Sequence, residues 1–115
     1  MNRPSPRRGE VWLTDLDPPF DHEQAGQRPV LVVSVDLFNS SAADMLVAVP
    51  LTTKLRQVVW HVAIQPPEGG TTRPSQIKCD HIRAISPRRL IRRMGVISAA
   101  TLAEVEDRLR VLLDL

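Results

Sequence analysis

The sequence DLDPPFDHEQAGQRPVLVVSV, residues 15–35, contains the end of one predicted strand, a Pro-rich loop and the whole of a second predicted strand. Its last seven residues, 29–35, are almost all apolar and mostly Val, which is typical of a strand buried on both faces. The loop before that strand carries a cluster of polar side chains, Asp21, His22, Glu23, Gln24 and Arg28. Because rigid strands fix the position of such a loop, binding and catalytic groups concentrate there. We therefore expect the functional site to form around this loop.

Further short apolar segments, bounded by Gly and Pro, predict the other strands of the fold. They lie at residues 10–16, 45–51, 58–64, 75–85 and 92–97. Pro50 predicts a bulge or a sheet edge near the end of its strand, because proline cannot donate to a strand ladder. Ser98 is a plausible N-cap for a last helix, whose apolar residues recur three or four apart at Leu102, Val105, Leu109 and Leu112. The predicted fold is mainly β (α+β), a small barrel of strongly bent antiparallel strands with a C-terminal helix packed on it.

The segment SQIKCDHIRAI, residues 75–85, alternates between apolar and polar residues and is predicted to form one continuous strand. Residues two apart share a face of a strand, so Gln76, Lys78 and Asp80 are expected on one side and Cys79 in the core. The strand ends at Thr52, Thr53 and Lys54 are expected to lie near this face.

Length and composition indicate one globular domain. With 115 residues, 43% of them hydrophobic and 24% charged, a single core is sufficient, and we expect a flexible N-terminus at residues 1–8 and one domain at 9–115. The longest apolar runs are too short to span a bilayer, the N-terminus lacks a signal-peptide pattern, and a lone cysteine, Cys79, cannot form an internal disulfide. Together these features predict a cytoplasmic protein.

The basic residues are dominated by arginine, which accounts for 13 of the 15 Lys and Arg residues. Arginine binds phosphate oxygens bidentately, so this composition is compatible with a nucleic-acid partner. A coding bias toward arginine codons explains the same composition equally well.

The polar residues include an acid, a base and a cation but no spacing that predicts a metal site, a glycine-rich phosphate loop or a serine nucleophile elbow. No cofactor is expected. Such a set suits cleavage of RNA by its own 2′-hydroxyl, where one group removes the proton, another protonates the leaving 5′-oxygen and a guanidinium stabilises the phosphoryl oxygens.

Three elements of the sequence resemble the MazF/PemK family of toxin endoribonucleases. They are RRGEVWLTDLDPPFDHEQAGQRPVLVV with its EQxGxRPxLV core, VAVPLTTK, and IKCDHIRAIS. The resemblance extends over nearly the whole chain. It implies an SH3-like barrel, a homodimer, and metal-independent, sequence-specific cleavage of single-stranded mRNA to 2′,3′-cyclic phosphate and 5′-hydroxyl ends. It also implies a MazE-like antitoxin partner, through which the complex binds operator DNA.

The resemblance distributes the catalytic roles in two ways. One branch of the family emphasises positions matching Arg28 and Thr52, and the other emphasises Asp80 as base, the cation at Lys78 as acid and His22 as stabiliser. The second branch has arginine where this chain has Lys78. We therefore expect a composite catalytic site of Arg28, Thr52, Asp80 and His22. The expected RNA-binding residues are Glu23, Lys78, Gln76, Thr53 and Lys54.

The same residues also have structural interpretations. Arg28 could bridge a loop carboxylate, Thr52 could cap a turn, and Lys78 with Asp80 could be an exposed ion pair of little energetic weight. Two other functions are also considered. One is a CcdB-like, non-enzymatic gyrase poison, and the other is an inactive relative that only binds RNA or antitoxin.

Overall fold

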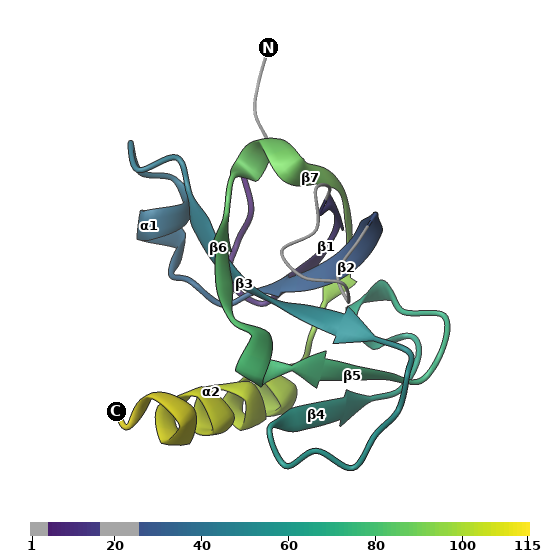
Figure 1. Ribbon diagram of the computed structural model, residues 1–115. Coiled ribbons are helices and arrows are strands. Elements are labelled where there is room, and N and C mark those ends of the chain that lie inside the picture. The colour runs from purple at the N-terminus through teal and green to yellow at the C-terminus, as the bar shows by residue number, and fades with distance from the viewer. Residues whose placement is uncertain (1–4, 17–25) are drawn as a thin grey trace.

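The computed structural model describes residues 5–16 and 26–115 of the chain (Figure 1). Within these ranges the chain forms seven strands, two α-helices and three 3-10 turns. In chain order the elements are β1 (Glu10–Asp15), β2 (Gln27–Val32), α1 (Asp36–Asn39), β3 (Leu46–Thr52), β4 (His61–Ile64), η1 (Glu68–Gly70), β5 (Ser75–Lys78), η2 (Cys79–His81), β6 (Arg83–Ile85), η3 (Pro87–Arg89), β7 (Leu90–Val96) and α2 (Ala99–Leu113).

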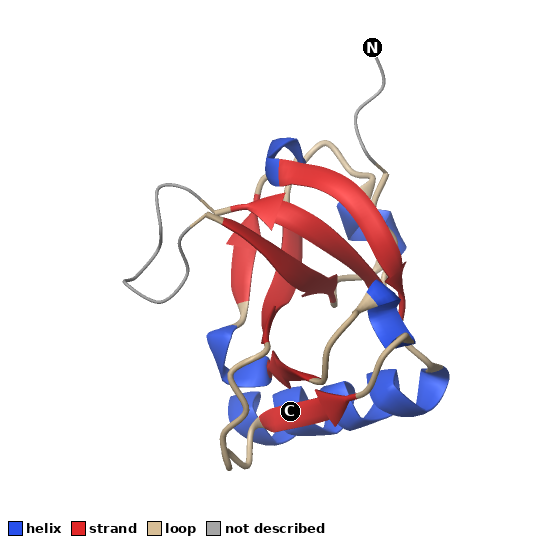
Figure 2. Ribbon diagram, turned by 90° about the vertical axis from the view of Figure 1, so that its right-hand side faces the viewer, coloured by secondary structure: helices blue, strands red, loops and turns tan. Residues whose placement is uncertain are grey.

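The strands form one bent sheet with the order β4-β5-β3-β2-β1-β7, and β6 pairs with the first half of β3. All of these pairings are antiparallel. Register shifts between β1 and β7 add to the bend that Figure 2 shows. The predicted bent antiparallel sheet with a C-terminal helix is therefore confirmed, although no pairing among the described strands joins β4 to β7 to close a barrel.

The middle of the apolar run, residues 30–33, is buried on both faces, as the sequence predicts, but the strand spans residues 27–32 and Val35 is exposed. Leu31 and Val33 belong to one core cluster, whereas Val30 and Val32 belong to a second cluster on the opposite face of the sheet. Each of these four side chains is buried. Period-two alternation thus divides one strand between two cores, and this strand ties the two halves of the fold together.

The segment predicted as one strand at residues 75–85 is interrupted, and this prediction is wrong. Leu51 on β3 faces Ile77 on β5, but Leu46, five residues earlier on β3, faces Ile85, eight residues later. Three residues are therefore extra, and they form the turn η2. The extra residues lie beside Pro50, whose missing N–H leaves no donor for a continuous ladder there. Consequently Asp80 lies on a turn instead of continuing the face of Gln76 and Lys78.

The residues before β1 make specific contacts. The Arg8 guanidinium donates hydrogen bonds to the Val33 carbonyl and to the Glu106 carboxylate, so it connects the start of the domain to α2. The Arg7 N–H donates to Glu10 Oε1 at 2.8 Å. The boundary expected at residue 9 stays a prediction. Among the described residues, no helix has the length and apolar character needed to cross a membrane.

Helix α2 begins at the predicted N-cap. The Ser98 hydroxyl accepts a hydrogen bond from the Thr101 N–H at 3.1 Å, and Val105, on the inner face of the helix, is fully buried. The Ser98 N–H donates to Glu68 Oε2 at 3.0 Å. In a capping box this last role belongs to a residue in the first turn of the helix. Here the carboxylate comes from η1, thirty residues earlier, so it also attaches the helix to the sheet.

Replacing Glu68 with Gln is expected to lower the stability of the protein by about 1 kcal/mol or less at neutral pH. Burial acts to raise the pKa of Glu68, but hydrogen bonds from Thr101 and Ser98 outweigh it and hold the pKa below its ordinary value. Such a carboxylate stabilises the fold above its unfolded pKa, and the stabilisation disappears as the pH falls through its folded pKa. Melting temperatures of wild type and Glu68→Gln should therefore converge on acidification. A constant difference across the pH range would contradict this assignment.

Candidate active site

A cavity of about 570 Å³ lies where β3 ends and β5 passes into η2. Its lining comes from β2, the end of β3, the loop that follows β3, β4, β5 and η2. The lining residues are Arg28, Leu51, Thr52, Thr53, Lys54, Arg56, Val58, His61, Lys78, Asp80 and His81. Four of these side chains are Lys or Arg and only one is a carboxylate, so the cavity favours an anionic ligand.

Strand register explains why residues far apart in the sequence meet in this cavity. Val30 on β2 faces Pro50 on β3. Arg28 lies two residues before Val30 on β2, and Thr52 lies two residues after Pro50 on β3. Because the strands are antiparallel, both steps lead toward the same end of the pair. Thr52 in turn faces Gln76 on β5. The antiparallel order β5-β3-β2 therefore places Arg28, near the start of β2, next to Thr52, at the end of β3.

The cavity brings together six of the nine residues predicted for the site. These are Arg28, Thr52, Thr53, Lys54, Lys78 and Asp80. Two others, His22 and Glu23, lie outside the described residues. Their roles stay predictions, as do the individual roles of the six.

The Thr52 hydroxyl makes a structural hydrogen bond and can still donate a second one. Its hydroxyl oxygen accepts a hydrogen bond from the Lys54 N–H at 3.0 Å, so it does cap the turn after β3. Accepting that bond uses a lone pair of the hydroxyl and not its proton. Thr52 can therefore cap the turn and still donate a hydrogen bond into the cavity.

Gln76, the ninth predicted residue, uses its amide to hold the loop between β3 and β4. Its Nε2 donates to the Arg56 carbonyl at 2.8 Å, and its Oε1 accepts from the Arg56 N–H at 3.1 Å. The same Oε1 lies 3.0 Å from His61 Nδ1. Its RNA contact stays a prediction, but the observed contacts show that it positions Arg56 and His61, which line the cavity.

Asp80 lies between two histidines. Its Oδ1 is 3.3 Å from His61 Nε2, and its Oδ2 is 3.9 Å from His81 Nε2. The His61 side chain is only 6% exposed, whereas that of Asp80 is 29% exposed. The carboxylate is thus accessible from the cavity on one side and backed by a buried imidazole on the other.

His61 and His81 were not among the residues predicted for the site, and their place around Asp80 was missed. The available signal was strand register, because His61 faces Lys78, which is two residues before Asp80. Arg56 and Val58 were also missed. Arg56 lies in a loop without a periodic pattern, and Val58, where the sequence predicts a strand to begin, lies before β4, which starts at His61. Within residues 5–16 and 26–115, no group of three or more His, Cys, Asp or Glu side chains could hold a metal ion.

Cys79, between Lys78 and Asp80, faces the core as predicted and is fully buried. Burial raises the pKa of its thiol to about 11, and the nearby Asp80 carboxylate acts in the same direction, while Arg108 acts against it. A thiol with this pKa is protonated near neutrality, and the thiolate is the reactive form. Cys79 is therefore a structural residue and not a nucleophile.

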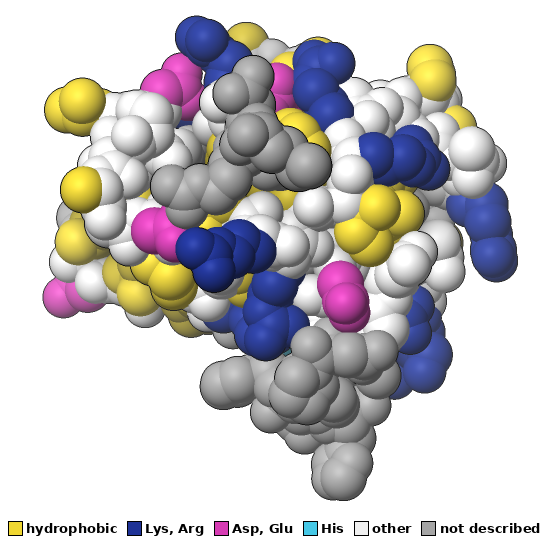
Figure 3. All heavy atoms as spheres, turned by 90° about the horizontal axis from the view of Figure 1, so that it is seen from above, with side chains coloured by type: hydrophobic (Ala, Val, Ile, Leu, Met, Phe, Trp, Pro, Cys, Tyr) yellow, Lys and Arg dark blue, Asp and Glu magenta, His cyan; other side chains and the backbone are white. Residues whose placement is uncertain are grey.

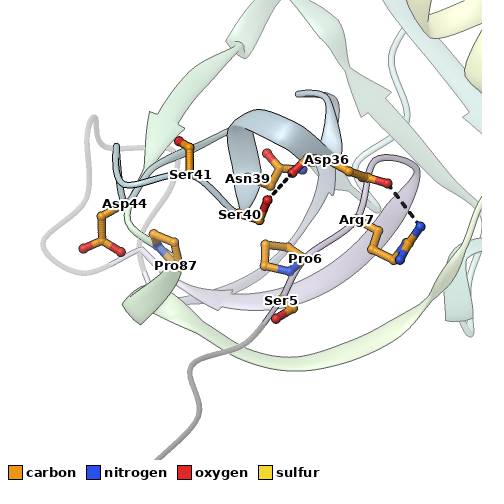
Figure 4. A pocket seen from close by; sticks show the side chains of 9 residues that line it. All are labelled: Ser5, Pro6, Arg7, Asp36, Asn39, Ser40, Ser41, Asp44 and Pro87. Carbon is orange, nitrogen blue, oxygen red and sulfur yellow. Dashed lines mark hydrogen bonds and ion pairs between the residues drawn. The ribbon is translucent and has the colours of Figure 1, made fainter.

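A second cavity, of about 310 Å³, lies at the other end of β3, beside α1 (Figure 4). Its charged groups include an exposed ion pair between Arg7 Nη2 and Asp36 Oδ2 at 3.3 Å. Its other side chains are mainly serines and prolines, with Asn39 and Asp44. Its charged side chains are one arginine and two carboxylates, so it lacks the excess of cations that distinguishes the first cavity.

Arginine is also concentrated on η3 and β7, at Arg88, Arg89, Arg92 and Arg93. Figure 3 views the molecule from above and shows several Lys and Arg side chains on that face, interspersed with a few carboxylates. Arg93 Nε donates to Glu10 Oε2 at 2.8 Å, and Arg89 Nη1 donates to the Asp15 carbonyl at 3.2 Å. These two arginines therefore stabilise β1, which gives this part of the cluster a structural role.

The chain matches a family of toxins in sequence. Residues 7–113 match the family described as PemK-like, MazF-like toxin of type II toxin–antitoxin system. Endoribonuclease MazF9 of Mycobacterium tuberculosis is 36% identical over 114 residues, which cover 95% of this chain and 97% of that protein.

Solved structures agree with this match. MazF (Form-I) of Deinococcus radiodurans superposes with a TM-score of 0.84 at 27% identity, covering 97% of this chain and 99% of that one. A mycobacterial endoribonuclease in complex with its cognate antitoxin superposes with a TM-score of 0.80 at 29% identity, covering 96% of each chain. The chain belongs to the family of PemK-like, MazF-like toxins of type II toxin–antitoxin systems.

Proposed function

We propose that this protein is the toxin of a toxin–antitoxin module and is a sequence-specific endoribonuclease that cleaves single-stranded RNA without a metal ion. The observation that carries the proposal is the convergence of Arg28, Thr52, Lys78 and Asp80 on one cavity from β2, β3, β5 and η2. The relatives named above include endoribonucleases, and none of them is a gyrase poison. These relatives therefore favour the ribonuclease over the gyrase poison.

Each of the four residues has a chemical role in this proposal. The Asp80 carboxylate removes the proton of the RNA 2′-hydroxyl, because it is the only carboxylate among the described residues that line the cavity. The 2′-oxygen attacks the adjacent phosphorus, and the Lys78 ammonium protonates the departing 5′-oxygen. Arg28 and Thr52 donate hydrogen bonds to the phosphoryl oxygens, where negative charge grows. The products are a 2′,3′-cyclic phosphate and a 5′-hydroxyl.

Arg28 is assigned charge stabilisation and not proton removal. A guanidinium stays protonated at any physiological pH, so it is a poor base. Lys78 holds a point charge with three donors, which grips phosphate with less geometric specificity than arginine would. It still has a proton to deliver, so the substitution at this position is compatible with the acid role.

The partners follow from the same function. The mycobacterial endoribonuclease named above was solved with its cognate antitoxin, and we assign this chain a MazE-like antitoxin as well. The protein acts in the cytoplasm as a homodimer, and operator DNA is bound through the antitoxin. Because most of its charged side chains are Lys or Arg, the cavity suits an acidic segment of the antitoxin as well as the RNA backbone.

The proposal is tested by incubating the purified protein with a long single-stranded RNA in EDTA. Primer extension locates the cuts, and end-group analysis identifies the termini. We expect discrete cuts at a recurring short sequence with cyclic phosphate ends, while single-stranded DNA of the same sequence survives because it lacks the 2′-hydroxyl. Intact RNA after incubation with folded, antitoxin-free protein would refute the proposal.

A further inference from the structure

His61 is a buried titratable residue on the wall of the cavity, and the mechanism above gives it no role. Its side chain is 6% exposed, yet both of its ring nitrogens face polar atoms. Nδ1 lies 3.0 Å from Gln76 Oε1, and Nε2 lies 3.3 Å from Asp80 Oδ1. A merely space-filling ring at this position would not need an acceptor at each end.

The backbone of Arg56 fixes the orientation of the Gln76 amide. The Arg56 carbonyl requires a donor and therefore faces Nε2, at 2.8 Å. The Arg56 N–H requires an acceptor and therefore faces Oε1, at 3.1 Å. Turning the amide over would break both contacts. Oε1 must then face His61, so the proton of a neutral His61 ring has to be on Nδ1.

This tautomer leaves a lone pair on Nε2, directed at the Asp80 carboxylate. Two acceptors 3.3 Å apart repel each other unless a proton lies between them. The His61 and Asp80 pair is therefore arranged to take up one proton. The neighbouring charged groups are cations on other elements, Arg28 on β2, Lys54 and Arg56 after β3, and Lys78 on β5, together with His81 on η2.

We propose that His61 is a positioning residue that holds Asp80 by its Oδ1 and receives the proton that Asp80 removes from the attacking 2′-hydroxyl. This inference rests on the proposed ribonuclease function. The O2′–H bond breaks as the O2′–P bond forms, and the proton passes through Asp80 to His61 Nε2. The P–O5′ bond breaks, and the 5′-oxygen takes its proton from Lys78. The imidazolium later returns its proton to solvent.

His81 does not fit this role. Its Nε2 is 3.9 Å from Asp80 Oδ2, which is beyond hydrogen-bond distance. Its side chain is also 34% exposed, so water competes for the same nitrogen. His61 is closer, more deeply buried and oriented by Gln76.

Two substitutions separate positioning from proton uptake. His61→Gln keeps a neutral amide that can donate toward Asp80 but cannot accept a proton as imidazole does, and His61→Phe keeps the ring volume and removes both nitrogens. We expect kcat for RNA cleavage to fall about 10-fold in His61→Gln and about 10²-fold in His61→Phe, with KM nearly unchanged. These losses are small for the removal of a proton-transfer group, because His61 acts through Asp80. In an Asp80→Asn background, His61→Phe should cause no further loss, because the two residues act as one unit.

The tautomer provides a readout that does not depend on activity. Nitrogen-15 spectra of the wild-type histidine side chains should show His61 protonated at Nδ1, and Asp80→Asn should change the Nε2 signal. A neutral ring protonated at Nε2, or a folded His61→Phe that retains wild-type kcat, would overturn the inference. If the wild type itself does not cleave RNA, the proposed function fails instead, and the spectra still decide the arrangement of His61.

Discussion

Replacing Arg28 with Ala is expected to reduce RNA cleavage by about 10³-fold, or about 4 kcal/mol of transition-state stabilisation. Arg28 lies at the start of β2 on the wall of the cavity, beside the position that Thr52 reaches from β3. Its side chain is exposed, so its removal leaves the two core clusters intact. Single-turnover cleavage of a short RNA that contains the recognition sequence measures the effect directly.

Two control variants make the Arg28 result interpretable. Arg28→Lys keeps a positive charge but loses the planar guanidinium fork, so it should recover only part of the rate. Arg7→Ala removes an exposed arginine beside the second cavity, at the other end of β3, and should leave the rate unchanged. Wild-type cleavage by a folded Arg28→Ala protein would show that the guanidinium has no role in the reaction.

Replacing Asp80 with Asn should lower kcat by about 10³-fold while RNA still binds, because the amide cannot take the 2′-hydroxyl proton. Asn keeps the size of the side chain, and Asp80 is on the turn η2 at the edge of the cavity, so little packing changes. Kinetics with the same short RNA give kcat, and binding of a 2′-deoxy analogue gives the affinity without cleavage.

The relative sizes of these two losses distinguish the two catalytic arrangements considered for the site. If Asp80 is the base, Asp80→Asn loses kcat and retains affinity for the 2′-deoxy analogue. If Arg28 and Thr52 alone carry the chemistry, Asp80→Asn stays within a few-fold of wild type. In that case the roles of Asp80 and of the His61 pair would both have to be abandoned.

The fold follows from local patterns in the sequence to a large extent. The apolar run at residues 29–35 predicts a strand buried on both faces, and its side chains do divide between two cores. The N-cap at Ser98 and the apolar spacing after it predict where α2 begins. These features depend on side-chain periodicity and capping, which act over a few residues and are therefore visible in a single sequence.

The site was less accessible to sequence reasoning, because its geometry depends on how separate strands pair. Alternation placed Gln76 and Lys78 on one face of β5 but could not show that the register beside Pro50 shifts by three residues at η2. That shift decides where Asp80 points. His61 met Asp80 only through the pairing of β4 with β5, which no local pattern specifies.

The buried thiol of Cys79, between Lys78 and Asp80, can be used to measure how often this turn opens. A reagent in solution cannot reach a fully buried sulfur, so any modification of Cys79 requires the turn to open first. The raised thiol pKa slows the reaction further and keeps background labelling low. The rate of thiol modification therefore measures how often the proposed catalytic turn opens in the native protein. The molecule contains one cysteine, so that rate belongs to this turn alone.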